Sequence, residues 1–387
     1  GDYFGERTLL DPDWKRHSNV TAATRDGKPL VCLQVSKAAF EGVLGPLTDL
    51  ITADSEWRFH TFLVRQRRKV NADLSKDARD KDFTRQGVTV VREPVEYALV
   101  QAPGREDGTT TELTLKTVAK GDGGFERFKE ETNLAALLCG ESRFVPLAIT
   151  TFESPTHLCS DMPTRVAISL RDLLDAENSG CMPPAAVRYY GGCAALVLEH
   201  LHAEMPAFGG VVLRDLSPDS FVVDANGCLQ LLDLRFAFAT ELAPMHEFVG
   251  FAHYQAPEVI AGEVHGKEAD YWGLGCLLYE LAIGTGPWLT GDPIKDSELG
   301  IYVRISQHRS PMRAPAGTKV EKGVMQLLNA LLHETPNKRI GCGAKGPEEV
   351  RSHAFFKGVM WDDLGGGEGL EAPHKAEAAA HVQEALK

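Results

Sequence analysis

Four polar segments in the second half of the chain carry many of the residue types that do chemistry. Two of them place an acidic side chain among apolar neighbours: Asp215 lies in residues 213–224 (LRDLSPDSFVVD), and Asp233 lies in residues 231–235 (LLDLR). Carboxylates on loops can orient a hydroxyl group or ligate a metal ion. Asp215 and Asp233 are therefore the first candidates for such chemistry.

The remaining two segments are residues 254–258 (YQAPE) and 270–275 (DYWGLG). In order and spacing the four segments together resemble the catalytic loop, metal-binding triplet, activation-segment end and buried-Asp helix of the protein kinase family. The resemblance covers roughly residues 85–361 and implies a cleft for ATP and Mg²⁺. It also implies that Asp215 orients the substrate hydroxyl and that Asp233 ligates the metal.

The same resemblance assigns structural roles to three charged residues. Asp270 corresponds to the buried aspartate of the large helical lobe. Residues 336–341 (PNKRIG) supply Arg339, which is the usual partner of the glutamate that ends the activation segment. We therefore predict a structural ion pair between Glu258 and Arg339.

A lysine in the first half of the kinase-like region completes the expected site. Residues 113–116 (LTLK) resemble the third-strand lysine motif, so Lys116 is expected to hold the α- and β-phosphates of ATP. Glu131, on the following helix, is the candidate that orients this lysine, and Glu130 is an alternative. The plainer interpretation is an exposed strand lysine and an unrelated helix glutamate.

Hydrophobic patterning predicts the elements that position these residues. Strand-like runs cover residues 88–91, 97–100 and 113–118, and a helix is expected near residues 125–138. From residue 185 onward helical patterns dominate, including apolar residues on one face between 320 and 332. The predicted fold class is α+β, a bilobal protein kinase fold preceded by a partial β-roll cyclic nucleotide-binding domain.

Several residues that should hold the triphosphate are replaced. The glycine-rich loop falls in residues 86–97 (QGVTVVREPVEY), which offer one glycine and place Glu93 and Pro94 where backbone amides should meet phosphate. Ser217 stands where a lysine would contact the γ-phosphate, and Ser220 stands where an asparagine would bind the second metal ion. Arg235 replaces the glycine of the metal-binding triplet.

These replacements predict impaired catalysis. If the loop amides, the lysine and the asparagine each contribute about 1.5–3 kcal/mol as charge-assisted bonds, their joint loss is about 5–9 kcal/mol. We expect a pseudokinase or weak kinase that holds ATP loosely. The alternative is an active serine/threonine kinase that transfers the γ-phosphate of ATP to protein substrates. A pseudokinase would have regulatory proteins as partners, whereas an active kinase would have protein substrates.

The activation segment suggests a loop that needs no activating phosphate. Alignment with the kinase pattern places Glu247 at the phosphorylated threonine, where its carboxylate is expected to pair with Arg214. A solvated loop glutamate is the alternative. Asp219 and Glu280 are acidic at positions where related kinases recognise basic substrates.

The N-terminal residues carry a second resemblance. Residues 1–10 (GDYFGERTLL) and 15–22 (KRHSNVTA) resemble the phosphate-binding cassette of cyclic nucleotide-binding domains. The resemblance implies that the amides near Gly5 and the side chain of Arg16 bind the cyclic phosphate, and that Glu6 accepts the ribose hydroxyl. A cassette upstream of a kinase unit points to the cyclic GMP-dependent protein kinases, with cyclic GMP as the ligand in the intact protein. A third alternative is that this sensor alone functions.

The predicted organisation is residues 1–52 for the cyclic nucleotide module, 53–84 for a helical linker, 85–361 for the kinase domain and 362–387 for a flexible tail with a short helix. The small lobe is expected at about 85–160 and the large lobe at about 161–361. A net charge of −13 argues against nucleic acid as a partner, and eight scattered cysteines are typical of reduced thiols in a cytoplasmic protein. No apolar run is long enough for a transmembrane segment.

Overall fold

The computed structural model describes residues 83–386, with gaps at 93–94, 104–109, 121–130, 132–133, 136–137, 139–143, 146–149, 155, 163–165, 204–209, 233, 240–248, 316, 319 and 367–371. The cyclic nucleotide cassette (Gly5, Glu6, Arg16) and the helical linker therefore lie outside the described residues. So do Asp233, Glu247, Glu93 and Pro94.

Five antiparallel strands form the sheet of the N-terminal half. They are β1 (Thr84–Arg92), β2 (Val95–Pro103), β3 (Thr110–Ala119), β4 (Thr150–Glu153) and β5 (His157–Met162). Their order in the sheet is β1-β2-β3-β5-β4. The three strand predictions for this region are confirmed.

Side chains alternate between the two faces of this sheet, as strand geometry requires. One face carries the buried residues Val100, Leu113, Leu115 and Cys159, and the partly buried Phe83 and Phe152 pack against them. The opposite face carries Val95, Tyr97, Val118 and Leu158, which share one buried cluster with Val166, Val222 and Leu232 of the C-terminal half. This second face is therefore where sheet and helical region pack together.

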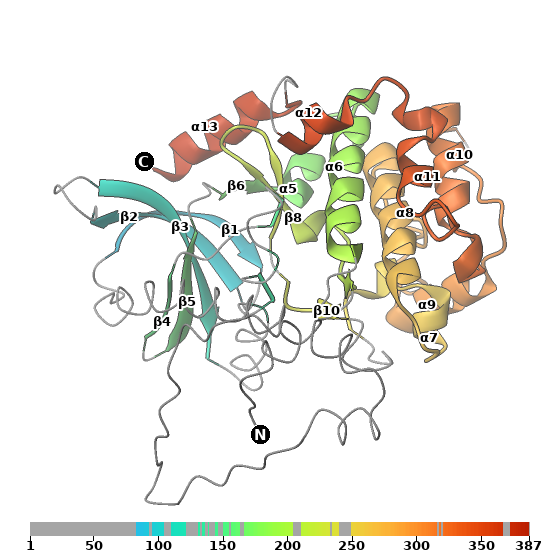
Figure 1. The fold of residues 1–387 in the computed structure, drawn as a ribbon, viewed down its shortest axis with the longest axis horizontal. Helices are drawn as coiled ribbons and strands as arrows, with labels where there is room; N and C mark the ends of the chain where they lie inside the picture. Colours follow the sequence, from blue (N-terminus) through green and yellow to red (C-terminus); the bar gives the residue numbers. More distant parts are fainter. Residues whose placement is uncertain are drawn as a thin grey trace, which may run out of the picture. The chain divides into compact units, whose positions relative to one another are not determined.

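Helices build most of the C-terminal half. Helices α6 (Pro184–His202) and α8 (Lys267–Ile283) run side by side in its core (Figure 1). A Cβ at Gly191 of α6 would lie 2.4 Å from the side chain of Leu278, so a larger residue there would force that leucine to move. The other described helices between residues 170 and 366 are α5 (Leu170–Asp175), α7 (Pro257–Ile260), α9 (Glu298–Gln307), α10 (Lys322–Leu331), α11 (Glu348–Arg351) and α12 (Trp361–Gly366).

The apolar pattern between residues 320 and 332 is confirmed as helix α10. Its buried side chains are Val324, Leu327, Leu328 and Leu331, which lie on one face. A further buried cluster centres on Trp272 of α8, whose ring stacks on Trp288 at 5.3 Å. None of the described helices is long and apolar enough to cross a lipid bilayer.

Among the described residues, two small sheets and four 3₁₀ turns complete the C-terminal half. Strands β6 (Val166–Ser169), β8 (Phe221–Asp224) and β9 (Leu229–Leu231) form one sheet, and β7 (Val211–Val212) pairs with β10 (Phe238–Ala239). The turns are η2 (Pro218–Ser220), η3 (Ala252–Tyr254), η4 (Pro336–Lys338) and η5 (Ala354–Phe356). The Asp215 loop therefore joins β7 to β8, and the loop after Leu231 joins β9 to β10.

The C-terminal residues differ from the flexible tail expected at 362–387. Helix α13 (Lys375–Ala385) contacts β1 and β6, and it buries Ala378 and Val382 (Figure 1). Before the helix, the His374 ring lies 2.9 Å from the Tyr190 hydroxyl and 2.9 Å from the Glu177 carboxylate. The short helix was predicted, but its packing was not, because an Ala-rich helix with one large buried residue shows almost no amphipathic pattern.

Candidate active site

Lys116 and Glu131 form a buried ion pair. Lys116 lies on β3 with 4% of its surface exposed, and its Nζ contacts Oε1 of Glu131. The same oxygen accepts a hydrogen bond of 3.1 Å from the amide of Leu234, which follows β9. Of the two candidate partners, Glu131 makes the contact, while Glu130 lies outside the described residues. The pair therefore connects the sheet to the loop that carries Asp233.

The loop before Asp215 is held by the carboxylate of Asp270. Oδ2 of Asp270 accepts hydrogen bonds of 2.8 Å from the amide of Leu213 and from Nε2 of His202, and Oδ1 accepts one of 2.8 Å from the amide of Arg214. Arg214 adopts a φ of 64°, which costs energy for a residue with a Cβ. The Asp270 carboxylate therefore fixes the backbone that presents Asp215.

Ser217 and Ser220 bond to each other. Their hydroxyl oxygens are 3.0 Å apart, and Oγ of Ser220 also accepts a hydrogen bond of 3.1 Å from the amide of Ser217. Both residues are buried, with 0% and 3% of their surfaces exposed. These are the positions at which a lysine and an asparagine were expected to contact phosphate and metal. The two hydroxyls satisfy one another inside the loop, so this geometry does not support Ser220 as a metal ligand.

Arg214 contacts the segment that follows β9. Its Nε donates a hydrogen bond of 2.6 Å to the carbonyl of Phe236, and its guanidinium lies 5.4 Å from the centre of the Phe238 ring. The predicted partner Glu247 lies outside the described residues, so that pairing stays a prediction. In the described region, the arginine ties the Asp215 loop to residues 236–238 through backbone and aromatic contacts.

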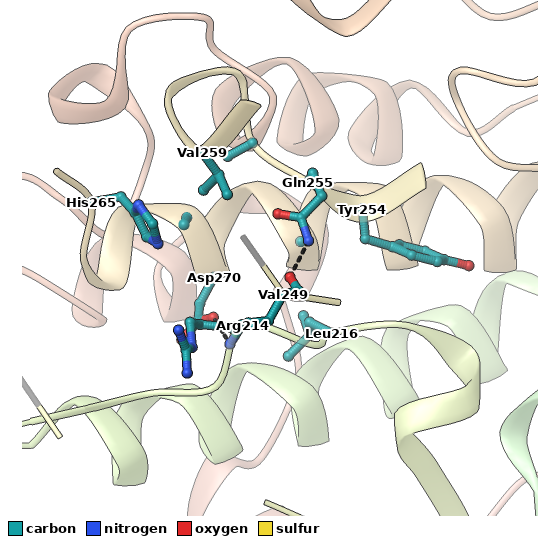
Figure 2. Close-up of a pocket in the computed structure, with 11 residues that line it drawn as sticks. Arg214, Leu216, Val249, Tyr254, Gln255, Val259, His265 and Asp270 are labelled. Carbon is teal, nitrogen blue, oxygen red and sulfur yellow. Dashed lines mark hydrogen bonds between the residues drawn. The ribbon is translucent and has the colours of Figure 1, made fainter. Parts of the chain in front are cut away.

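A small cavity lies beneath the end of the activation segment. Figure 2 shows its lining, which includes Arg214, Gln255, His265 and Asp270, and the hydrogen bond from Gln255 Nε2 to the Val249 carbonyl. A Cβ at Gly250, whose φ is 97°, would lie 2.8 Å from the carbonyl oxygen of Arg214. Neither Lys116 nor Glu131 lines this cavity, so it belongs to the packing between loops rather than to the nucleotide cleft.

Arg171 organises a second polar cluster near the catalytic loop. Its guanidinium donates to Asp219 (3.2 Å), to Glu280 (2.7 Å) and to the Tyr254 hydroxyl (3.1 Å), and that hydroxyl donates to Glu280. Burial and the neighbouring Glu280 carboxylate raise the pKa of Tyr254 well above its ordinary value. Asp219 and Glu280, expected to face basic substrates, are therefore both paired with an internal arginine.

Sequence reasoning missed Arg171. It lies 48 residues from Asp219 and 109 residues from Glu280 along the chain, and no local motif marks it. Only the folded arrangement brings the three charges together.

Glu258 and Arg339 form the predicted ion pair. Two nitrogens of Arg339 donate to the two carboxylate oxygens of Glu258, at 2.6 and 2.8 Å. The guanidinium also donates to the carbonyls of Glu268 and His333 at 2.9 Å each, and it lies 5.0 Å from the Trp272 ring centre. This pair anchors the end of the activation segment to the core of the helical half.

Comparison with known proteins decides the family. Residues 104–356, well over half of the chain, match the protein kinase domain. The chain belongs to the protein kinase family. Its bilobal organisation is the kinase fold, with β1–β5 in the small lobe and α5–α12 in the large lobe.

Relatives of this kinase include cGMP-dependent protein kinases. The chain is 25% identical over 378 residues to "cGMP-dependent protein kinase, isozyme 1" of Drosophila melanogaster, covering 94% of this chain and 46% of that protein. It is also 25% identical over 366 residues to the isozyme 2 forms cD5/T2 of the same organism, covering 93% of this chain and 36% of that protein. The chain therefore spans less than half the length of these relatives.

Proposed function

We propose that this chain is a degenerate kinase of the cyclic GMP-dependent type, which acts in cyclic nucleotide signalling with little or no phosphate transfer. The observation that carries the proposal is the mutual bond between Ser217 and Ser220. Phosphoryl transfer depends on holding phosphates and metal in line while their charge is neutralised. Two neutral hydroxyls that bond to each other supply neither a cation for the γ-phosphate nor an amide oxygen for the metal.

An active serine/threonine kinase is the second candidate. The buried contact between Lys116 and Glu131 favours it, because active protein kinases need the third-strand lysine paired with the helix glutamate. Under this alternative Asp215 orients the substrate hydroxyl and Asp233 holds Mg²⁺. The Lys116–Glu131 pair is required for activity but does not replace the missing contacts to phosphate and metal.

For residues 1–52 we propose the C-terminal part of a cyclic nucleotide-binding domain, followed by a linker over 53–84. Gly5, Glu6 and Arg16 are the proposed contacts to the cyclic phosphate and ribose. In the intact protein, cyclic GMP should then raise the melting temperature, because a ligand that binds the native state stabilises it. Arg16→Ala should remove most of that rise.

A phosphate-transfer assay separates the two candidates. The chain is incubated with radiolabelled Mg-ATP and serine-containing basic peptides, beside Asp215→Ala and Asp233→Ala. Asp175→Ala, at the exposed end of α5, serves as the matched control. We expect turnover at least about a thousandfold below the usual 1–100 per second. Turnover in that usual range, abolished by Asp215→Ala and not by Asp175→Ala, would refute the degenerate-kinase proposal.

A further inference from the structure

Tyr97 lies on β2, on the face of the sheet that packs against the C-terminal half. It is the ladder partner of Lys116 on β3, so the two side chains project from the same face of the sheet. The Lys116 Nζ lies 5.9 Å from the centre of the Tyr97 ring. Tyr97 is fully buried, with 0% of its surface exposed. The ring therefore lies directly beside the lysine that a kinase uses to hold nucleotide phosphates.

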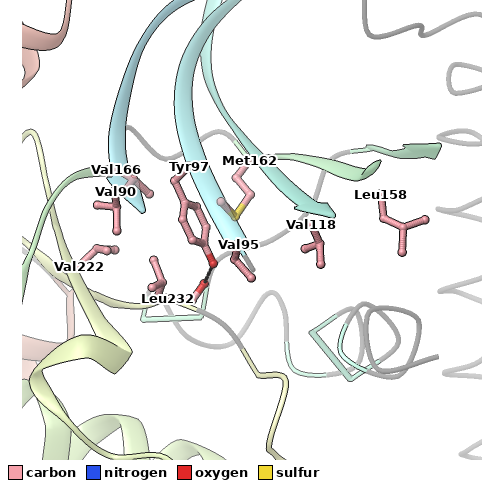
Figure 3. Close-up of a cluster of buried hydrophobic side chains, with 9 residues drawn as sticks. All are labelled: Val90, Val95, Tyr97, Val118, Leu158, Met162, Val166, Val222 and Leu232. Carbon is pink, nitrogen blue, oxygen red and sulfur yellow. Dashed lines mark hydrogen bonds between the residues drawn. The ribbon is translucent and has the colours of Figure 1, made fainter. Parts of the chain in front are cut away.

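The side chain spans the space between the lobes. Its hydroxyl donates a hydrogen bond of 3.0 Å to the carbonyl of Leu232, the residue before Asp233 (Figure 3). Leu232 follows β9 of the large lobe, whereas Tyr97 lies on β2 of the small lobe. Tyr97 thus connects the sheet face that packs on the large lobe to the loop of Asp233, which the kinase resemblance assigns to the metal ion.

The surroundings of Tyr97 are closed to solvent. Its cluster contains residues of the small-lobe sheet (Val90, Val95, Val118, Leu158, Met162) and residues from the other side of the cleft (Val166, Val222, Leu232), as Figure 3 shows. Each of these residues has 6% or less of its surface exposed. Close-packed interiors leave no space for a second ring system. A nucleotide could enter only if these side chains moved apart.

The location expected for a bound nucleotide lies close to Tyr97. In protein kinases the phosphates lie under the glycine-rich loop and on the third-strand lysine, between the lobes. A base attached to phosphates held by Lys116 is then expected in the region between the sheet, β8 and Leu232. Tyr97 and its apolar neighbours fill this region.

We propose that Tyr97 takes the place of the nucleotide base and holds the lobes closed, so that the ATP site is occluded by the protein's own side chain. The proposal deepens the degenerate-kinase function and rests on it. Nucleotide then binds only the fraction of molecules in which Tyr97 has left the cleft, and the apparent affinity falls by that fraction. If Tyr97 only packed the core, its truncation would leave the nucleotide affinity unchanged.

The test measures equilibrium binding of a fluorescent ATP analogue to the full chain and three variants. Tyr97→Val introduces another residue that favours strands but removes the ring, and Tyr97→Phe keeps the ring but removes the bond to Leu232. Tyr302→Val, at a partly buried site on α9, is the matched control. We expect Tyr97→Val to tighten the apparent Kd at least tenfold, Tyr97→Phe to tighten it about two- to tenfold, and the control to leave it unchanged.

Amide hydrogen exchange of β2 and residues 229–232 gives a second readout that needs no nucleotide. Exchange in both segments should be faster in Tyr97→Phe than in the unchanged chain, even if Tyr97→Val does not fold. Unchanged exchange in Tyr97→Phe would overturn the proposal.

The binding outcomes separate this proposal from the function it rests on. Folded Tyr97→Val that binds no better than the unchanged chain overturns the role of Tyr97 and leaves the degenerate-kinase proposal standing. The same conclusion follows if the unchanged chain binds nucleotide as tightly as Tyr97→Val does but transfers no phosphate. If the unchanged chain both binds tightly and transfers phosphate, both proposals fail.

Discussion

The side chains that support the fold have different hydrogen-bond partners from the side chains expected to face the triphosphate. Asp270 satisfies three donors, and Arg339 satisfies two carboxylate oxygens and two backbone carbonyls. Ser217 and Ser220, by contrast, offer hydroxyls that are already bonded to each other. Among the described residues, Asp270 and Arg339 thus have several partners each, while Ser217 and Ser220 place two neutral hydroxyls where the kinase pattern has a lysine and an asparagine.

The buried pair between Arg339 and Glu258 gives a prediction about stability. Arg339→Ala leaves the Glu258 carboxylate buried without its cation, which typically costs about 3–5 kcal/mol. Equilibrium urea unfolding measures the loss as a lower midpoint. Arg309→Ala, at an exposed position, is the control and should change the free energy of unfolding by less than about 0.5 kcal/mol. A loss below about 1 kcal/mol for Arg339→Ala would contradict the assigned role.

His308 gives a prediction about pH. Its ring packs against Trp272 and Trp288, and burial lowers its pKa from the ordinary value of 6.5, despite the hydrogen bond to the Leu332 carbonyl and the nearby Glu334. Arg309 and His333 lower it further. A lowered pKa means that folding favours the neutral ring. Its contribution to stability is present above about pH 6.5 and is lost as the pH falls below that value.

Denaturant unfolding between pH 7.5 and pH 5 tests this expectation. His308→Gln should flatten the fall in stability over that range. Hydrogen bonds from Ser310 lower the pKa of the Glu334 carboxylate to about 2. The contribution of this carboxylate to stability is therefore lost only as the pH falls below 4.5, its ordinary pKa. An identical slope for His308→Gln and the unchanged chain would refute the expectation.

Among the helices and strands, α13 has the least obvious role. It packs on β1 of the small lobe, and the residue before it bonds to Tyr190 of α6 in the large lobe. A Cβ at Gly87 of β1 would lie 1.7 Å from the carbonyl oxygen of Ala385, so the end of the helix lies directly against the strand. The C-terminal helix therefore contacts both lobes, as Tyr97 does in the cleft.

His374 tests this contact. His374→Ala removes the ring stacked on Tyr190 and leaves the buried Tyr190 hydroxyl without that hydrogen bond, which typically costs about 1–3 kcal/mol. The loss should appear in urea unfolding and as faster amide exchange in both α13 and β1. His381→Ala, partly exposed on the same helix, is the matched control. Faster exchange in α13 alone would show that the helix does not stabilise the strand.

For the chain as a whole, the sequence predicted local elements and motifs better than contacts between distant segments. Strand-like apolar runs predicted β1–β3, helical periodicity predicted α10, and the resemblance to protein kinases predicted the Glu258–Arg339 pair. These signals lie within short segments or within motifs of fixed order. The assignments of Asp233, Glu247, Gly5, Glu6 and Arg16 stay predictions.

The features that the sequence did not reveal depend on contacts between distant segments. Tyr97 and Leu232 are 135 residues apart, and nothing near Tyr97 shows that its hydroxyl reaches another lobe. The only local signal was a large aromatic residue at the end of a loop that should have been rich in glycine. Arg171 and His374 were missed for the same reason, because their partners lie far along the chain.

The central claim is that this kinase fold binds ATP weakly at best because its nucleotide site is degenerate and occluded, and titration calorimetry of Mg-ATP into the unlabelled, unchanged chain tests it most directly. We predict no saturable heat at nucleotide concentrations up to about 1 mM, the upper end of usual enzyme KM values. One-to-one binding with a Kd of about 10–50 μM, well inside the range of working enzymes, would contradict the account.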